Sequence, residues 1–182
     1  MEGDKKVKIE SQIWMAENLN YAGKEEGPEL GMCHSAADPT CENYGRLYDW
    51  ETVMASASSS SANPSGVQGI CPAGWHLPSD AEWEELVSVA GGTEVAGGRL
   101  KSKSLWVVGP GTDDFGFAAL PSGNGTADGS SVNVGSRAGW WTATADANAA
   151  RAYRPLIQST DGFSVGVTAV KTLSCPVRCV QN

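Results

Sequence analysis

The segment Cys71-Pro-Ala-Gly-Trp-His-Leu-Pro-Ser-Asp-Ala-Glu-Trp83 carries the strongest local structural signal in the chain. Its Ser79-Asp-Ala-Glu82 part is a capping box, in which the serine and the glutamate satisfy free amides of a first helical turn. A helix is therefore expected to begin here, and Gly91-Gly92 is typical of its end. Apolar residues with helical spacing give this helix one buried face: Trp83, Leu86, Val87 and Ala90.

A hairpin and a shorter helix are expected upstream of this segment. Residues 7–19 alternate apolar and polar side chains, which predicts two paired strands with Glu10-Ser11-Gln12 as the turn. Asp49 is suited to cap a helix, because its carboxylate can accept from a free backbone amide. The apolar positions of that helix are Trp50, Val53, Met54 and Ala57. The serine-rich stretch 55–69 predicts a loop.

No helix is expected after residue 93, where short β-rich pieces alternate with glycine and serine. These pieces are Phe115–Leu120, Gly139–Thr144, Ala149–Ile157, Gly162–Ala169 and Pro176–Val180. Two early helices followed by strands predict an α+β fold with a mixed, mostly antiparallel sheet. The length of 182 residues predicts one domain, 1–182. The 22 glycines and 9 prolines predict that it is rich in loops.

The charge and hydropathy of the chain exclude several classes of partner. The net charge of −8 argues against nucleic acid, because binding phosphates requires a basic face. Every apolar run is shorter than the roughly 18 residues of a membrane-spanning helix, so no membrane insertion is expected. The first residues lack the apolar core of a signal peptide, and the sequence leaves open whether a leader was removed.

Cysteine usage indicates an oxidising environment. Five cysteines stand at positions 33, 41, 71, 175 and 179, and none of them forms a C-x-x-C pair. His34 and His76 do not stand at zinc-finger spacing, so no metal site is predicted. Two disulfides and one odd thiol are expected, as in a protein that lies outside the reducing cytosol. We therefore expect an extracellular protein or one on a cell or virion surface.

Six blocks of the sequence resemble one family, the Fibrobacter succinogenes major paralogous domain. They are Ile13–Tyr21, Tyr44–Trp50, Cys71–Trp83, Asp114–Pro121, Trp140–Thr144 and Val177–Val180. This family is related to the C-type-lectin-like fold of formylglycine-generating-enzyme-type domains, so the resemblance implies that fold. It also implies disulfides Cys33–Cys41 and Cys71–Cys179, and a protein of a bacterial surface.

The carboxyl-terminal part of the chain departs from the family pattern. The family usually reads Lys-x-x-Gly-Phe-Ser-Val-Arg-Cys where this chain has Lys171-Thr-Leu-Ser-Cys-Pro-Val-Arg-Cys179. The pattern between residues 146 and 170 is also altered. Variable proteins of diversity-generating retroelements are similar in fold, and their C-terminal stretch is rewritten at adenine-bearing codons to vary a binding surface. The resemblance thus implies a variable binding region at about 140–171.

Residues that could support catalysis or bind metal are better explained by structure. Cys175 has no histidine near it in sequence that would activate it, and a free cysteine commonly behaves as a small hydrophobic residue. Thr112-Asp113-Asp114 is expected to be a solvated turn rather than a calcium site. His76, between Trp75 and Leu77, is expected to be packed. No enzymatic activity, catalytic residue, cofactor or metal is therefore predicted.

The adjacent residues Trp140 and Trp141 suggest one buried and one displayed aromatic ring. Neighbouring side chains of a strand point to opposite faces, so Trp141 is predicted in the core and Trp140 partly exposed. An exposed ring could stack on a sugar or on a protein partner. Trp14, Trp50, Trp75 and Trp83 fall on elements with a core pattern and are expected to be buried.

These inferences combine into a predicted non-enzymatic binding protein that displays its C-terminal region, about 140–171. The expected partner is a protein or surface ligand, and the alternative is an adhesive or glycan-binding module of a bacterial surface. Tyrosine and arginine are enriched where binding energy concentrates. The predicted ligand-binding residues are Trp140, Asp146, Asn148, Arg151, Tyr153, Arg154, Ile157, Gln158, Thr160 and Asp161.

Overall fold

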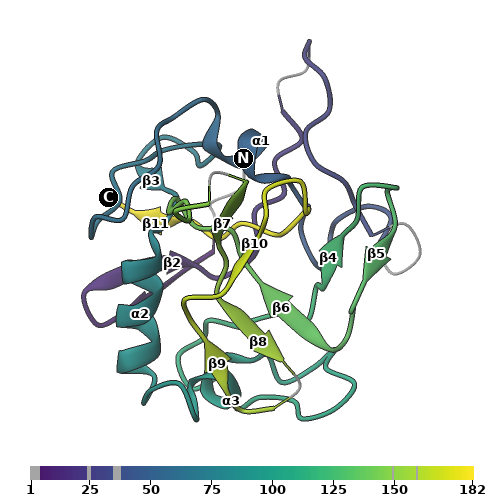
Figure 1. Ribbon diagram of the computed structural model, residues 1–182. Coiled ribbons are helices and arrows are strands. Elements are labelled where there is room, and N and C mark those ends of the chain that lie inside the picture. The colour runs from purple at the N-terminus through teal and green to yellow at the C-terminus, as the bar shows by residue number, and fades with distance from the viewer. Residues whose placement is uncertain (1–4, 24–25, 35–37, 149, 159) are drawn as a thin grey trace.

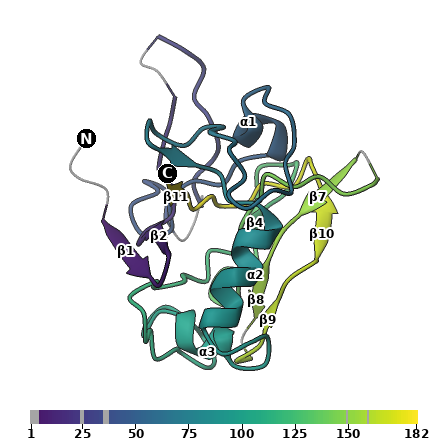
Figure 2. The same cartoon turned by 90° about the vertical axis from the view of Figure 1, so that its left-hand side faces the viewer.

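A computed structural model describes residues 5–23, 26–34, 38–148, 150–158 and 160–182 (Figures 1 and 2). Within these residues the chain forms a small α+β fold with three helices and several antiparallel sheets. The helices are α1 (Trp50–Met54), α2 (Asp80–Val89) and α3 (Ala96–Leu100). The strands are β1 (Lys6–Ile9), β2 (Gln12–Met15), β3 (Trp75–His76), β4 (Asn124–Gly125), β5 (Ser131–Val132), β6 (Arg137–Gly139), β7 (Arg151–Tyr153), β8 (Leu156–Gln158), β9 (Phe163–Ser164), β10 (Thr168–Val170) and β11 (Val180–Gln181).

The largest sheet joins the two ends of the chain. Its strand order is β1-β2-β11-β3, so the last strand lies between the opening hairpin and the strand that precedes α2 (Figure 1). Val180 pairs with Trp14 on one side and with His76 on the other. The Cys71–Cys179 disulfide adds a covalent link at the same place, and Cys33–Cys41 closes a short loop. Both pairings implied by the family resemblance are confirmed.

The capping box forms as predicted at the start of α2. The Ser79 hydroxyl accepts from the Glu82 amide, and the Glu82 carboxylate accepts from the Ser79 amide at 2.9 Å. Trp83, Leu86 and Val87 are buried, as their spacing predicts. The helix ends at Val89, and the two glycines that follow adopt positive φ angles, which a glycine backbone permits without a steric penalty.

The hairpin and the first helix also form, with shorter limits than predicted. The hairpin turn is Glu10-Ser11, and Gln12 already belongs to β2, where it pairs with Ile9. Asp49 caps α1 by accepting from the Thr52 amide at 2.9 Å. The helix ends at Met54 and does not reach Ala57, because the next two residues have left-handed φ angles of 49° and 68°.

The expectation of no helix after residue 93 is wrong, because Ala96–Leu100 forms α3. Gly97-Gly98 in this segment disfavours a helix by propensity. Here the absence of side chains allows another segment to dock. A Cβ atom at Gly97 would lie 2.5 Å from the carbonyl oxygen of Gly162, and one at Gly98 would lie 2.9 Å from a carboxylate oxygen of Asp161. The close approach of residues 161–162 therefore requires glycine at these two positions of the helix.

The predicted β-rich pieces are only partly strands. The structure places β7 and β8 within 149–157, although Ala149 itself lies outside the described residues. It places β9 and β10 at 162–170, and β11 begins only at Val180. Residues 115–120 contribute a single bridge, between Ala119 and Lys101, and residues 140–144 form no strand. No helix in the described part of the chain has the length and apolarity needed to cross a membrane.

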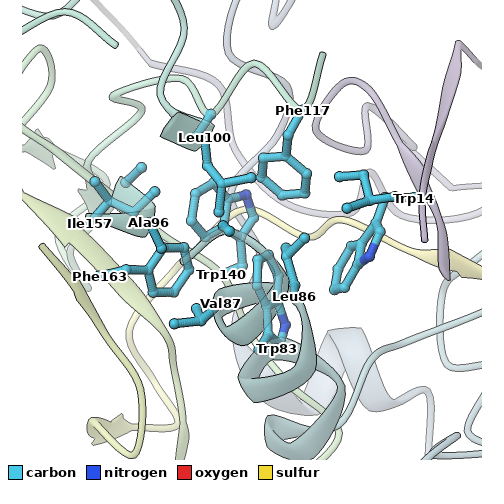
Figure 3. Close-up of a cluster of buried hydrophobic side chains, with 14 of the residues drawn as sticks. Trp14, Trp83, Leu86, Val87, Ala96, Leu100, Phe117, Trp140, Ile157 and Phe163 are labelled. Carbon is cyan, nitrogen blue, oxygen red and sulfur yellow. The ribbon is translucent and has the colours of Figure 1, made fainter. Parts of the chain in front are cut away.

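Two clusters of buried side chains fill the molecule, and the adjacent tryptophans connect them. The first cluster contains Trp83, which stacks on Trp140 with ring centroids 5.1 Å apart (Figure 3). The second contains Trp141, Trp50 and the Cys71–Cys179 disulfide. Trp14, Trp50, Trp75 and Trp83 are all buried as predicted.

The prediction that Trp140 is partly exposed is wrong. The exposed fraction of both Trp140 and Trp141 is 0%. Their side chains enter different clusters, as expected for neighbours along an extended chain, but both sides of this segment are covered. Alternation along the chain shows which side chains point to the same side, but it does not show whether that side is buried. Here both sides are buried.

Candidate binding face

The predicted binding region is built on one long, twisted hairpin. Its first arm runs through β7 and β8, and its second arm returns through β9 and β10 (Figure 1). Tyr153 pairs with Thr168 and Leu156 pairs with Ser164, so the returning arm contains one extra residue between these pairs. That bulge includes Gly166, whose φ is 68°. A bulge increases the local twist and turns the side chains beyond it.

One side of this hairpin packs against the molecule. Ala152 belongs to the second buried cluster, whereas Ile157 and Phe163 belong to the first. Figure 2 shows α2 lying along the hairpin, and the rings of Trp83 and Phe163 connect the two with centroids 6.1 Å apart. Core residues thus support both arms of the hairpin.

The other side of β7 and β10 carries accessible side chains, which we call the outer face: Arg151, Tyr153, Thr168 and Val170. Arg151 and Tyr153 flank the buried Ala152, so they point away from the core. Their cross-strand partners are Val170 and Thr168, which places all four on one surface. The Arg151 guanidinium donates to the hydroxyl and to the carbonyl of Thr168, at 2.9 Å and 2.6 Å. Its orientation is therefore set before any ligand arrives.

Asp146 and Asn148 precede the outer face in the loop that enters β7. The Asp146 amide donates to the Arg151 carbonyl, and the Asn148 side chain accepts from the Ala150 amide. Asn148 is exposed and Asp146 is partly exposed. The structure therefore brings together four of the predicted residues: Asp146, Asn148, Arg151 and Tyr153.

Three further predicted residues lie at the opposite end of the hairpin. Gln158, Thr160 and Asp161 are exposed near its tip, which docks on α3. The Lys101 ammonium donates to the Thr160 carbonyl at 2.9 Å and lies 3.6 Å from the Asp161 carboxylate. Arg151 and Gln158 are seven positions apart along the extended chain, about 23 Å. The sequence suggested one set of binding residues, and the structure divides it into two.

Two other predicted binding residues are buried, and with Trp140 this is a correction to the predicted set. The exposed fraction is 0% for Ile157 and 7% for Arg154. Ile157 follows the inward parity of β8 and packs in the first cluster. Arg154 enters the bulged part of the hairpin, where its backbone amide donates to the Val167 carbonyl. In this conformation Ile157 offers no surface to a ligand and Arg154 offers very little.

Arg154 lies beside the odd thiol of Cys175 in the interior. Burial raises the pKa of Cys175 to about 11, and the nearby Arg154 guanidinium offsets only part of that rise. The thiol is therefore protonated at neutral pH, in contrast to a cysteine nucleophile, which reacts as the thiolate. A Cβ atom at Gly139 would lie 2.8 Å from the guanidinium, so the glycine makes room for it.

A buried polar cluster around His76 was not predicted beyond the packing of the ring. His76 lies 2.7 Å from a Glu82 carboxylate oxygen through Nε2, and 2.7 Å from the Asn182 side-chain oxygen through Nδ1. The second Glu82 oxygen accepts from the backbone amides of Ser65 and Ser79. The helix cap of α2 therefore also holds the imidazole. The sequence carried no signal for this contact, because His76 lies in β3 and Glu82 in α2, and only the fold brings them together.

The two histidines are expected to titrate on opposite sides of the ordinary histidine pKa of 6.5. Burial alone would lower the pKa of His76, but the hydrogen bond and charge of Glu82 and the bond to Asn182 raise it overall. Burial lowers the pKa of His34, and the charge of Asp38 offsets part of this effect. NMR titration of the labelled imidazole rings should show one transition above and one below 6.5.

The assignment is checked with His76→Gln, which should remove the upper transition. Because the folded pKa of His76 exceeds the unfolded one, its stabilising contribution is complete below about pH 6.5. That contribution is lost as the pH rises through the folded value. If the ring of His76 titrated below 6.5, desolvation would outweigh the Glu82 contact, and the described charge pairing would be incorrect.

Comparison with known proteins assigns the chain to a family. A family model described as the Fibrobacter succinogenes major domain matches residues 7–181. The chain belongs to this family. No curated protein and no solved structure matches the chain significantly. The family match extends over the hairpin and the sheet that joins the chain ends.

Four of the sequence blocks that resemble the Fibrobacter succinogenes major domain meet around one buried side chain, Arg178. Its guanidinium donates to the Asn18 side-chain oxygen at 3.0 and 3.2 Å and to the Phe117 carbonyl. The same Asn18 oxygen accepts from the Trp140 indole at 2.8 Å. The Phe117 ring lies 4.3 Å from the guanidinium carbon. These blocks therefore build the interior that supports the hairpin.

Proposed function

We propose that this chain is a non-enzymatic binding module that presents its outer face, Arg151, Tyr153, Thr168 and Val170, to a protein or surface ligand. The observation that carries the proposal is the division of the hairpin into a packed inner side and an accessible outer side. Arginine and tyrosine are residue types that concentrate binding energy at interfaces. Asp146 and Asn148 extend the same end of the face.

The rigid support of the hairpin favours binding without reorganisation. Its inner residues belong to both buried clusters, and Arg151 is held across the strand pair by two hydrogen bonds. Side chains that are ordered before binding lose less conformational entropy when the ligand arrives. The outer residues can therefore change identity while the scaffold keeps its shape.

We also propose that the fold is C-type-lectin-like and carries a variable region, as in the variable proteins of diversity-generating retroelements. The gene itself provides the test. A nearby, nearly identical copy of the segment encoding 140–171, differing only at adenines, is expected. The differing codons should encode outer residues such as 151 and 153 and not the inner positions 152 and 157. Absence of such a copy, or differences at inner codons, would overturn the diversification.

A protein that displays this face would act outside the reducing cytosol. The two disulfides fit a secreted or surface protein, since such bonds persist in oxidising compartments. The protonated, buried Cys175 favours a structural role over nucleophilic chemistry. The alternative, an adhesive or glycan-binding module of a bacterial surface, cannot rely on a glycan stacked on Trp140, because that ring is buried.

Outer and inner positions of the hairpin are expected to differ in tolerance to substitution. Val170→Thr and Tyr153→Ser should each change the free energy of unfolding by about 1 kcal/mol or less, as accessible positions usually do. Ile157→Ala should lower it by about 2 to 5 kcal/mol, because it leaves a cavity in the first cluster. Urea denaturation of the three variants measures this. Equal losses at all three positions would show that the outer face is needed for folding and is not free to bind.

A further inference from the structure

A concave site lies away from the outer face, between the opening hairpin and the start of α2. It is a cleft of about 600 Å³, within the 300 to 1,000 Å³ range of ligand pockets. Its walls come from the β1–β2 turn, the 63–68 loop, β3, α2 and the last residues of the chain. It shares no residue with the outer face, so it is independent of the function proposed above.

The floor of the cleft is charged, buried and already ordered. His76 and Glu82 line it, and the exposed fractions of their side chains are 5% and 3%. Each carboxylate oxygen of Glu82 and each nitrogen of His76 has a partner within 2.9 Å. Such a floor sets the shape of the site at little entropic cost on binding. Trp75, which is mostly buried, contributes an aromatic wall.

A preorganised carboxylate stands at the rim. Glu85 accepts from the Ser11 hydroxyl at 2.6 Å through one oxygen and from the Asn63 amide at 2.8 Å through the other. These two bonds lower the pKa of Glu85, so it is ionised at neutral pH. Each carboxylate oxygen can accept more than one hydrogen bond. The group can therefore accept further bonds from a ligand while Ser11 and Asn63 hold it in place.

The remaining polar lining consists of neutral amides. The Gln68 amide donates to the Cys71 carbonyl, and the Gln181 oxygen accepts from Lys6 at the edge. Within the described residues, these bonds leave the Gln68 oxygen as an acceptor and the Gln181 amide nitrogen as a donor. The lining thus offers both donors and acceptors, but it includes no lysine or arginine.

We infer that this cleft binds a neutral sugar, with Glu85 accepting from its hydroxyl groups and the surrounding amides completing the contacts. Sugar hydroxyls donate and accept, so they match a mixed lining of amides and carboxylate. An anionic ligand would be repelled by Glu85, and the described lining holds no lysine or arginine to offset this repulsion, since Lys6 stands only at the edge. A guanidinium or ammonium group has donors only, so it could pair with Glu85 but would leave the Gln181 amide N–H groups without an acceptor.

The test is an array of immobilised neutral oligosaccharides, beside sialylated and sulfated ones, probed with the intact disulfide-bonded protein. The best neutral glycan is then titrated into labelled protein by NMR, and binding should shift the backbone signals of Trp75 and His76. Glu85→Gln should weaken that binding about tenfold, which is the loss of one hydrogen bond to a charged group. Asn63→Ala should weaken it as well.

Glu84→Gln provides the matched control, because Glu84 is an exposed neighbour on α2 that does not line the cleft. It should leave binding unchanged within twofold. Binding of anionic glycans only, or of an arginine-containing control peptide in place of sugars, would overturn the inference. It would also be overturned if no neutral glycan bound at millimolar concentration, or if Glu85→Gln and Glu84→Gln behaved alike. An outer-face variant such as Tyr153→Ser should retain sugar binding, which separates this test from that of the proposed function.

Discussion

Replacing Arg178 with alanine is expected to lower the free energy of unfolding by about 3 to 5 kcal/mol, the largest effect of any single substitution considered. The side chain is completely buried, and burial lowers the pKa of its guanidinium to about 9, so it remains charged at neutral pH. The Asn18 oxygen and the Phe117 carbonyl compensate that charge. Without the guanidinium the Phe117 carbonyl loses this donor, the Asn18 oxygen keeps the Trp140 indole as a donor, and a cavity opens beside Trp140.

Two further variants separate charge from volume at this position. Arg178→Met fills most of the cavity and removes the charge, so it should cost less than alanine, since buried charges are often replaceable by apolar groups of similar size. Arg137→Ala, at an exposed position of β6, should change stability by about 0.5 kcal/mol or less. Urea denaturation measures all three. A loss below about 1 kcal/mol for Arg178→Ala would show that its contacts do not hold the interior together.

Removing the Cys71–Cys179 disulfide is expected to cost more than removing Cys33–Cys41. The first closes a loop with a sequence separation of 108, and the second closes one of 8. A cross-link restricts the unfolded chain more when its loop is longer, which gives about 4.8 kcal/mol for the first and about 2.5 kcal/mol for the second. Cys71 and Cys179 are also buried in the second cluster, so their loss leaves unfilled space.

The comparison uses the double variants Cys71→Ala with Cys179→Ala, and Cys33→Ala with Cys41→Ala. Each is unfolded in urea, with Cys175→Ala included in every chain so that no free thiol can exchange with a disulfide. The wild-type pairing with Cys175→Ala serves as the reference. Equal or reversed losses would show that strain or residual structure in the unfolded chain outweighs loop length.

Both experiments concern the support of the outer face. Cys179 and Arg178 stand next to β11, and Arg178 touches the ring of Trp140, which stacks on Trp83. Trp83 in turn contacts Phe163 in the hairpin. Loss of the Cys71–Cys179 disulfide or of the Arg178 side chain should therefore loosen the inner side of the hairpin before it alters the outer residues. Hydrogen exchange at Ala152 and Ile157 would report this loosening.

Local sequence signals predicted the elements whose residues interact with near neighbours. The capping box of Ser79 and Glu82, the Asp49 cap and the alternation in 7–19 all involve residues a few positions apart. Their formation depends on backbone hydrogen bonds that are satisfied within the same segment. The disulfide pairing came from family resemblance, because five cysteines allow several pairings and their spacing does not choose among them.

Contacts between distant segments decided which predicted binding residues are accessible. Alternation correctly placed Ala152 between two outward residues, yet it could not show that the chain is covered on both sides at Trp140. The sequence pattern also did not show that Ile157, and Arg154 at the bulge, are buried. Thr168 and Val170 were not singled out, because only the strand register places them beside Tyr153 and Arg151.

Local sequence patterns were sufficient to predict the α+β class, the capped helix α2, the opening hairpin, and two disulfides with one odd cysteine. The tertiary structure alone decided that Gly97 lies in a helix, that Trp140 is buried, and that the cleft at Glu85 exists. The physical reason is the distance along the sequence between the residues that must meet. Caps and turns are satisfied by neighbours along the chain, whereas burial and concave sites depend on distant segments, such as Ser11 and Gln181 in the cleft, which are 170 residues apart.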